Sequence, residues 1–407
     1  MARLRCNTEA TPQAAAAFRR PMEARTALRQ AGERAEHLLR ALARQIPDMQ
    51  RRAVLLDAQD AFPTEDIGLL RDLGALAAPL PTALGGLGWG TEPEAALDLM
   101  DALRLLGHGN LSVGRLYEAH VNALRLVTRD GTAAQTRTFA IDAMAGHLFA
   151  LWVTDPPETP LCLRPDFVLD GCKAPGSGAG HVTRALVTAQ LPSGDSCLLV
   201  IEPPGPECTD ISGWETQGMR AARSARVMLD GIRVAPGAMI GSAGAYLRQP
   251  DFSAGAWRTS AVTLGGLEAL VGELRRHLVI RNRDGDPYQR ARVGEALIAQ
   301  ETARLWVRQA AAVGEAQDGD AQDIVTTVNL ARIAVETACL DAMRIVQRGL
   351  GLVAFRRGEL AELLLRDLAT YLRQPATDEI LAEAAAHFMQ RDLPSAAHGN
   401  PQMRAGE

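Results

Sequence analysis

The sequence has few cysteines, none of them paired in a C-x-x-C motif, and no long apolar run. Six cysteines lie scattered along 407 residues. That pattern argues against a zinc site or a disulfide framework, and it fits a reducing cytoplasm. No apolar run approaches the roughly 18 residues that a membrane helix needs. We therefore expect a cytoplasmic protein with no membrane span and no metal centre.

Lysine is almost absent as well, because Lys173 is the only one and arginine carries nearly all the positive charge. The net charge is −5 and the isoelectric point is near 6.0. A domain that binds nucleic acid usually shows a basic surface, so this composition argues against such a partner. The eight histidines are isolated in the sequence and show no spacing typical of a metal site or a catalytic triad.

The chain changes character twice, which divides it into three structured parts. Up to about residue 147 the apolar residues recur at helical spacing, the next ninety or so residues read as short strands and turns, and helical spacing then returns. The expected fold is mostly α with a central β domain. The expected parts are a flexible N-terminal extension (1–30), an N-terminal helical domain (31–147), a β domain (148–245), a C-terminal helical bundle (246–391) and a tail (392–407).

Helices are expected wherever apolar residues repeat every three or four positions. In the first helical domain the expected spans are 31–58, 94–106, 113–127 and 133–144, with a further helix that starts near Pro63. In the bundle they are 260–281, 291–316 and 325–347. Their apolar stripes are typical of long helices packed side by side.

The β domain opens with a short apolar run, Phe149–Val153, that stops at Thr154, Asp155 and two prolines. Proline has no N–H group to continue a ladder, so the strand must end there. The Thr154 hydroxyl then faces a loop, where it could hold a polar ligand or simply lie on the surface. Turns every eight to twelve residues predict a small antiparallel barrel or sandwich.

Six short motifs in this order resemble the acyl-CoA dehydrogenase family, and the resemblance covers nearly all of residues 38–389. They are G-G-L-G at 85–88, V-T-D-P at 153–156, L-D-G-C-K at 169–173, G-M-R at 218–220, Q-R-G-L-G at 347–351 and R-D at 366–367. The family has a helical domain, a middle β barrel and a helical bundle. The resemblance therefore implies that architecture, with FAD bound between the β domain and the bundle in homodimers or homotetramers.

The resemblance also implies which residues meet the FAD. Trp152 and Thr154 would lie at the flavin ring, and Ser177 falls where the family has a threonine. Arg281 matches an arginine that reaches the FAD diphosphate of a neighbouring subunit, where a guanidinium pairs well with phosphate. Gln347 and Gly351 would approach the adenosine half across the dimer interface. A helix-end arginine and a helix C-cap glycine are the plain structural alternatives for Arg281 and Gly351.

The carboxylate base of the family is missing from both of its usual positions. Gln374 or Pro375 stands at one, and Trp257 stands at the other. None of these side chains accepts a proton at neutral pH. Three acids lie nearby in sequence and are weak substitutes: Asp251, Asp378 and Glu379.

Two further departures concern the substrate. The family's G-A-G-S-D segment, which helps to hold CoA, is replaced by Pro157–Leu161, and its W-I-T beside the flavin reads Pro175-Gly176-Ser177. We therefore expect a flavin pocket that is more open and a weaker case for CoA.

The sequence is compatible with three functions. The first is an FAD-dependent oxidoreductase of acyl-CoA dehydrogenase type, which oxidises the CH–CH group of an acyl thioester or a related small molecule. The second is a flavin-dependent oxidase or monooxygenase on the same fold, which needs no α-proton base. The third is a non-catalytic flavin-binding or scaffold protein.

Overall fold

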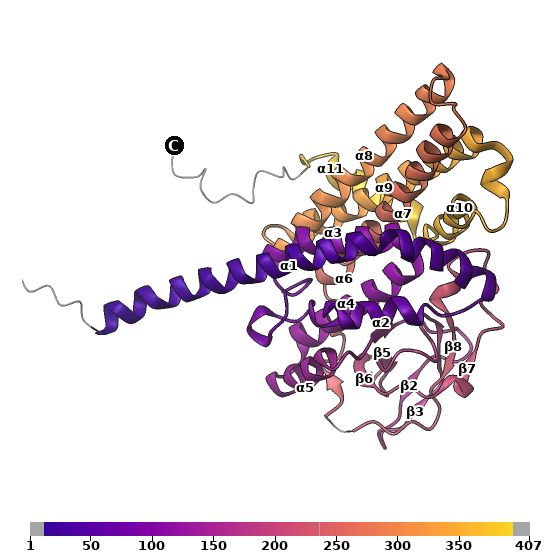
Figure 1. Cartoon of the computed structure of the whole chain (residues 1–407). Helices are drawn as coiled ribbons and strands as arrows, with labels where there is room; N and C mark the ends of the chain where they lie inside the picture. Colours follow the sequence, from indigo (N-terminus) through magenta and orange to yellow (C-terminus); the bar gives the residue numbers. More distant parts are fainter. Residues whose placement is uncertain (1–11, 236, 394–407) are drawn as a thin grey trace, which may run out of the picture.

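The computed structural model describes residues 12–235 and 237–393, with side chains from residue 29 onward. Its elements follow the expected order of helices, then strands, then helices, and the three parts pack on one another (Figure 1). Residues 1–11 of the expected extension and 394–407 of the expected tail lie outside the described residues. No described helix combines the length and the apolar character that crossing a membrane requires.

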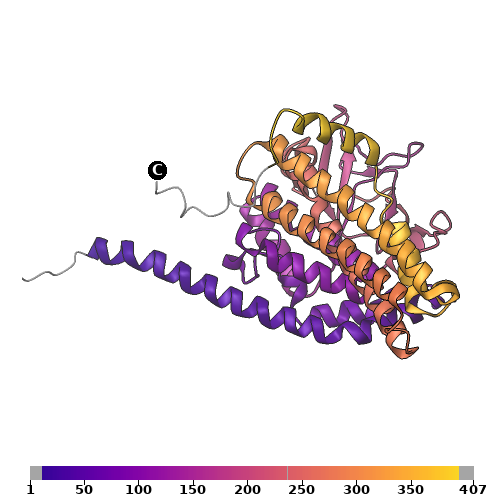
Figure 2. The same cartoon turned by 90° about the horizontal axis from the view of Figure 1, so that it is seen from above.

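The first helix is longer than its apolar pattern predicts. Helix α1 runs from Pro12 to Gln59, so part of the expected extension of residues 1–30 is helical. Its N-terminal half reaches away from the body (Figure 2). Periodicity missed it because this half has no regular apolar stripe, although alanine and arginine favour helix by propensity alone.

The rest of the N-terminal part is a group of helices close to the expected spans. Its members are α2 (Thr64–Asp72), α3 (Ala96–Gly109), α4 (Leu111–Asp130) and α5 (Ala133–Met144). Asn110 caps α4, because its side chain accepts hydrogen bonds from the N–H groups of Ser112 (2.9 Å) and Val113 (3.4 Å). This cap fixes where α4 begins, and α4 later supplies one wall of the candidate site.

The β domain holds two sheets. One has the order β3-β2-β5-β6-β9 with β1 beside β5, and the other has the order β4-β8-β7. The strands are β1 (Phe149–Trp152), β2 (Cys162–Leu163), β3 (Leu169–Asp170), β4 (Cys172–Gly176), β5 (Arg184–Gln190), β6 (Ser196–Ile201), β7 (Thr209–Asp210), β8 (Ala225–Met228) and β9 (Met239–Ile240). Strands β5 and β6 pair as an antiparallel hairpin that turns between Gln190 and Ser196.

The expectation of a purely antiparallel domain is wrong in one respect, because β1 and β2 both run parallel to β5. Sequence turns predict hairpins only between neighbours in the chain. The long excursion between β1 and β5 lets the chain return in the same direction, which no local pattern reveals.

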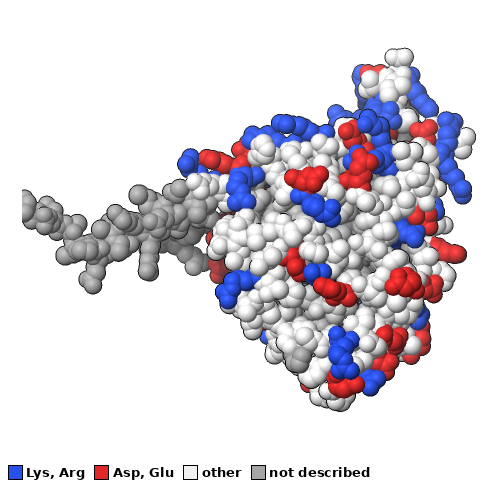
Figure 3. Space-filling model, turned by 60° about the horizontal axis from the view of Figure 1, so that its bottom comes forward, with Lys and Arg blue, Asp and Glu red and all other residues white. Residues whose placement is uncertain are grey.

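The C-terminal part is a bundle in which α8 and α9 lie side by side along α7 (Figure 2). Its helices are α6 (Asp251–Ala254), α7 (Ala256–Ile280), α8 (Pro287–Ala316), α9 (Ala321–Leu350), α10 (Leu360–Tyr371) and α11 (Thr377–Phe388). Helices α3 and α7 approach closely, since a side chain on Gly265 would begin 2.0 Å from the Arg104 carbonyl oxygen. Acidic and basic side chains are interspersed over the face shown in Figure 3.

The single lysine ties the two sheets to the loop after β1. Lys173 is fully buried, and its Nζ donates to Asp155 Oδ1 (2.6 Å) and Thr188 Oγ1 (2.8 Å). Asp155 Oδ1 also accepts from the Leu161 N–H at 3.0 Å. Burial lowers the pKa of Lys173 against the opposing pull of Asp155. The lysine therefore holds the loop that carries Thr154.

Breaking this pair from its two ends should have unequal costs. Asp155→Ala leaves a buried ammonium without its counter-ion, and we expect a loss of about 3–5 kcal/mol in the free energy of unfolding. Lys173→Met fills the space with an apolar chain and leaves Asp155, which is 27% exposed, to water, so its loss should be smaller. Urea unfolding of both variants checks this order, and an equal or larger loss for Lys173→Met would contradict it.

Candidate functional site

A cavity of about 310 Å³ lies where the β domain meets helices α4, α7 and α10. Ligand pockets usually measure about 300–1,000 Å³, so this one is at the lower end of that range. The β domain and its loops supply Leu151, Val153, Thr154, Pro175, Ser177, Trp214, Met219, Ala222, Ser224 and Tyr246. The helices and the segment after α10 supply Arg115, Glu118, Asn122, Thr259, Thr370, Tyr371, Arg373 and Gln374.

Two of the residues expected at the flavin, Thr154 and Ser177, line this cavity together. The Ser177 hydroxyl lies 3.2 Å from that of Ser224. Trp152 lies behind them, buried to 1% exposure, and its Nε1 donates to the Ser177 carbonyl oxygen at 2.9 Å. Trp152 therefore positions the Ser177 loop and does not line the cavity.

The three residues expected at the diphosphate and adenosine lie elsewhere in the chain. Gln347 lines a second cavity of about 750 Å³ between α1, α9 and α10. Arg281 and Gly351 are exposed at the C-terminal ends of α7 and α9 and line neither cavity. The resemblance assigns all three to the flavin of a neighbouring subunit, so one chain alone does not bring them to Thr154.

Glu118 on α4 is the one carboxylate among the described residues that line the smaller cavity. Its Oε2 pairs with Arg115 and its Oε1 accepts from the amide of Asn122. Sequence reasoning missed these residues because they fall inside a helix that was assigned from its apolar positions. A signal was present, since Arg115, Glu118 and Asn122 follow at spacings of three and four and so share one helix face.

The suggested substitute bases do not line the cavity. Asp251 binds Gln317 (2.6 Å), Arg125 (3.1 Å) and Arg129 (3.0 Å). Burial acts to raise the pKa of Asp251, but the Gln317 bond and the two arginines outweigh it and hold that pKa below its usual range.

The other two candidates, Asp378 and Glu379, are exposed in the first turn of α11. Gln374, one of the two residues that could stand at the family's first base position, lines the cavity, and its amide donates to the Tyr371 carbonyl oxygen at 2.8 Å.

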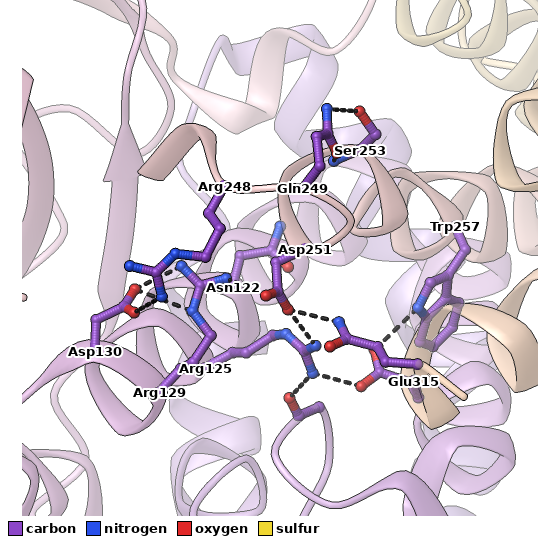
Figure 4. Close-up of polar contacts among 12 residues, drawn as sticks. Asn122, Arg125, Arg129, Asp130, Arg248, Gln249, Asp251, Ser253, Trp257 and Glu315 are labelled. Carbon is purple, nitrogen blue, oxygen red and sulfur yellow. Dashed lines mark hydrogen bonds and ion pairs between the residues drawn. The ribbon is translucent and has the colours of Figure 1, made fainter. Parts of the chain in front are cut away.

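The second base position lies within a buried network of charges (Figure 4). Trp257 Nε1 donates to Glu315 Oε1 at 3.0 Å, and Arg258 pairs with the same oxygen. Arg125 binds the other oxygen of Glu315 at 2.5 Å. Arg258 also donates to Asn122 Oδ1 at 2.9 Å, which connects the network to the cavity. Both carboxylates at this end, Glu118 and Glu315, are therefore held in ion pairs.

The cavity presents donors that fit a flavin ring. An isoalloxazine carries several ring nitrogens and carbonyl oxygens that accept hydrogen bonds. Trp214 Nε1 is buried at the cavity with no hydrogen-bond partner among the described residues, and the hydroxyls of Thr154 and Ser177 face the same space. Unpartnered buried donors are costly, so a ligand with acceptor atoms would satisfy a real deficit.

One histidine is less isolated than the sequence suggests. His387 Nε2 lies 2.5 Å from Asp323 Oδ1, and Asp320 completes a group whose ligand atoms lie within 4.8 Å of one another. Arg391 already pairs with Asp323 at 3.1 Å. The group is therefore an ion-pair cluster at the start of α9, away from the cavity.

Comparison with known proteins shows which proteins share this sequence and architecture. No family model matches the chain. It is 25% identical over 287 residues to an amino sugar nitrososynthase, RubN8, of Streptomyces rubradiris, a match that covers 60% of this chain and 60% of that protein. It is 23% identical over 378 residues to 3-sulfinopropanoyl-CoA desulfinase of Advenella mimigardefordensis, covering 85% of this chain and 91% of that protein. The chain thus spans less than two thirds of the first relative's length.

Solved structures give the same fold over most of the chain. KijD3 in complex with FMN and a dTDP-linked amino-keto sugar has a TM-score of 0.75 at 19% identity, covering 89% of this chain and 95% of that one. TdsC from Paenibacillus sp. A11-2 with FMN and indole has 0.73 at 18%, covering 90% and 98%. Butyryl-CoA dehydrogenase from Megasphaera elsdenii has 0.73 at 16%, covering 87% and 98%.

These likenesses confirm the fold that the motifs predict, so the chain is a divergent protein of acyl-CoA dehydrogenase fold. The curated relatives above are named as enzymes, and solved neighbours hold FMN.

The buried network should be far more sensitive than a surface ion pair on the same helix. Glu315→Gln removes the negative charge between Arg125 and Arg258, and we expect a loss of about 3–5 kcal/mol in the free energy of unfolding. Glu301→Gln, which breaks an exposed pair with Arg304, is the matched control and should cost under about 1 kcal/mol. Chemical denaturation measures both, and similar losses would contradict the importance of the network.

Proposed function

We propose that this chain is a flavin-dependent monooxygenase that transfers an oxygen atom to a nitrogen or sulfur atom of a small polar molecule. The observation that carries the proposal is the state of Glu118. It is the one carboxylate lining the cavity among the described residues, and it is held by Arg115 and Asn122.

Dehydrogenation of an acyl thioester needs a base that removes the α proton. A general base must reach the proton that it abstracts and must be free to accept it. Both carboxylate oxygens of Glu118 are already bonded, one to Arg115 and the other to Asn122, so neither is free to reach a substrate. The family's usual positions hold Gln374 or Pro375 and Trp257. Losing a general base costs about 10²–10⁴ in rate. Oxygen transfer needs no such base.

Bound reduced flavin would supply two electrons to O₂, so that one oxygen atom enters the substrate and the other leaves as water. The chain's own part is to hold the ring and shape the space beside it. Thr154 and Ser177 offer hydroxyl groups, and Trp214 offers an indole N–H. Arg115, Asn122 and Gln374 leave a polar wall for the substrate.

We infer FMN as the cofactor in place of the FAD that the resemblance implies. The cavity of about 310 Å³ suits a flavin ring beside a small molecule, and the adenosine half of FAD would have to lie outside it. The similar structures KijD3 and TdsC hold FMN. If the chain instead binds FAD as a homodimer or homotetramer, Arg281, Gln347 and Gly351 are the residues to contact the neighbour's cofactor.

The substrate class follows from the polar lining and from the relatives. A nitrososynthase and a protein that binds a dTDP-linked amino sugar are among them, so an amine is the first class to try. The desulfinase, which matches 85% of this chain, is named for an acyl-CoA substrate, and this keeps thioester chemistry as the rival.

Purified protein distinguishes the two functions. The apoprotein is titrated with FMN and with FAD, and flavin fluorescence quenching gives both affinities. The FMN-loaded protein is then reduced chemically and mixed with O₂ and a panel of amines and sulfides. We expect tighter binding of FMN and substrate-dependent oxygen incorporation from ¹⁸O₂. Bleaching of the flavin by acyl-CoA without oxygen would support the rival, and no binding of either flavin would overturn both.

The hydroxyls at the ring give a more specific test. Thr154→Val and Ser177→Ala each remove a group that lines the cavity, and we expect FMN affinity to fall about 5–10-fold for each, as for the loss of one hydrogen bond. Thr138→Val, on an exposed face of α5, is the control and should leave the affinity unchanged. Unchanged affinity in both cavity variants would place the flavin elsewhere.

A further inference from the structure

One segment, residues 214–224, forms a partition between the two cavities, and we call it the wall segment. Trp214, Met219, Ala222 and Ser224 line the smaller cavity. Thr216, Gln217 and Arg220 line the larger one. The position of this segment therefore sets the shape of the candidate flavin cavity.

The wall segment has an unusual backbone that needs support. Met219 and Arg223 both have left-handed backbone angles (φ 58° and 46°), although neither is glycine. Such conformations cost about 1–3 kcal/mol each and persist only where the surroundings fix them. Arg223 is held by an ion pair with Asp60 at 3.1 Å, and Met219 is held by α10.

Three contacts join the wall segment to α10. The Met219 N–H donates to Asp367 Oδ1 at 2.6 Å, and Arg366 Nη1 donates to the Gln217 carbonyl oxygen at 2.5 Å. Gly218 lies so close that an added Cβ would be 2.2 Å from the Arg366 carbonyl oxygen. Of Gln217, Gly218 and Met219, only Met219 lines the smaller cavity, so the bond from its N–H group to Asp367 acts directly on the wall of that cavity.

Asp367 is a buried acid with several charges around it. It is 5% exposed, and the charged groups that act on it are Asp57 from α1 with Arg366 and Glu362 from α10 itself. Arg366 is shared, because it binds Asp57 (2.7 Å) and Glu362 (2.6 Å). From the wall segment, Arg220 lies 4.0 Å from Asp57. The cluster holds no counter-ion devoted to Asp367.

We propose that Asp367 is a positioning residue, whose ionised carboxylate fixes the Met219 wall of the cavity and whose protonation loosens it. A hydrogen bond to a charged acceptor is roughly twice as strong as one between neutral groups, so the Met219 bond weakens when the acid gains a proton. Only the flavin readout below depends on the proposed function.

The acid titrates in an accessible range. Burial, with help from Asp57 and Glu362, raises the pKa of Asp367 to about 7, against the opposing effects of the Met219 bond and Arg366. The folded protein therefore binds a proton between pH 4 and 7 that the unfolded chain has lost, so this group's contribution to stability falls as pH rises through that window. The wall is held most firmly above pH 7, where Asp367 is ionised.

A direct test observes the Met219 amide. Selective ¹⁵N labelling of the 11 methionines gives a simple NMR spectrum, and Met219→Leu identifies the peak. We expect that peak to move with a midpoint near pH 7 in the wild type and to stay fixed in Asp367→Asn. His181 lies near Arg223 and also titrates, but a shift due to His181 would survive in Asp367→Asn. No movement in the wild type, or the same movement in the variant, would overturn the proposal.

The second readout is FMN affinity. In the wild type it should weaken about 3–10-fold from pH 8 to pH 6, and in Asp367→Asn it should be weak and independent of pH. Asp378→Asn, on the exposed start of α11, is the matched control and should follow the wild type. Gly218→Ala, which pushes the wall from α10 without altering any charge, should weaken binding at every pH and keep the pH dependence.

The NMR measurement and the FMN-affinity measurement test different claims, so one can fail while the other succeeds. Absence of FMN binding overturns the proposed function, while the Met219 peak still decides whether Asp367 holds the wall. If FMN binds with the same pH dependence in Asp367→Asn as in the wild type, the proposed function stands and the role of Asp367 falls.

Discussion

The burial of paired charge between α4 and the C-terminal bundle is the constraint on which the site depends. Glu315 is almost fully buried, and it lies between Arg125 of α4 and Arg258 of α7. A buried charge is tolerated only when it is paired and hydrogen-bonded, so each of these residues fixes the others. The network reaches the cavity through Asn122, which binds both Arg258 and Glu118. It thereby connects the packing of the two helical parts to the electrostatics of the site.

This arrangement explains why an acid can line the cavity without being available as a base. Both oxygens of Glu118 are occupied by bonds, one to Arg115 and the other to Asn122. Trp257, which replaces the family's second base, donates to the same Glu315 that neutralises Arg258. A tryptophan bonded to the buried Arg258–Glu315 ion pair therefore stands where the family has a carboxylate.

Local sequence patterns predict the helices well because their apolar stripes repeat over many turns. The expected helix 133–144 coincides with α5, and the breakers after Val153 end β1 close to where they were expected to. The parallel pairing of β1 with β5 was missed, because register between distant strands leaves no local trace. The motifs that resemble the family pointed to two residues that line the cavity, Thr154 and Ser177. Thr154 lies in V-T-D-P, and Ser177 follows shortly after L-D-G-C-K. It missed Arg115 and Glu118, because polar residues on an otherwise apolar helix look like its solvent face.

Two residues that line the cavity, Thr154 and Met219, differ in how they depend on the rest of the chain. Thr154 is positioned by local means: two prolines end the strand, and the buried Lys173 holds Asp155 next to it. Met219 is positioned by a residue 148 places away, through the 2.6 Å bond to Asp367. A wall held by a local turn should keep its shape when the helical bundle is disturbed, whereas a wall held by α10 should respond to it. The side of the cavity formed by residues 214–224 is therefore where changes in the bundle would alter the shape of the cavity, whereas the Thr154 side would stay in place.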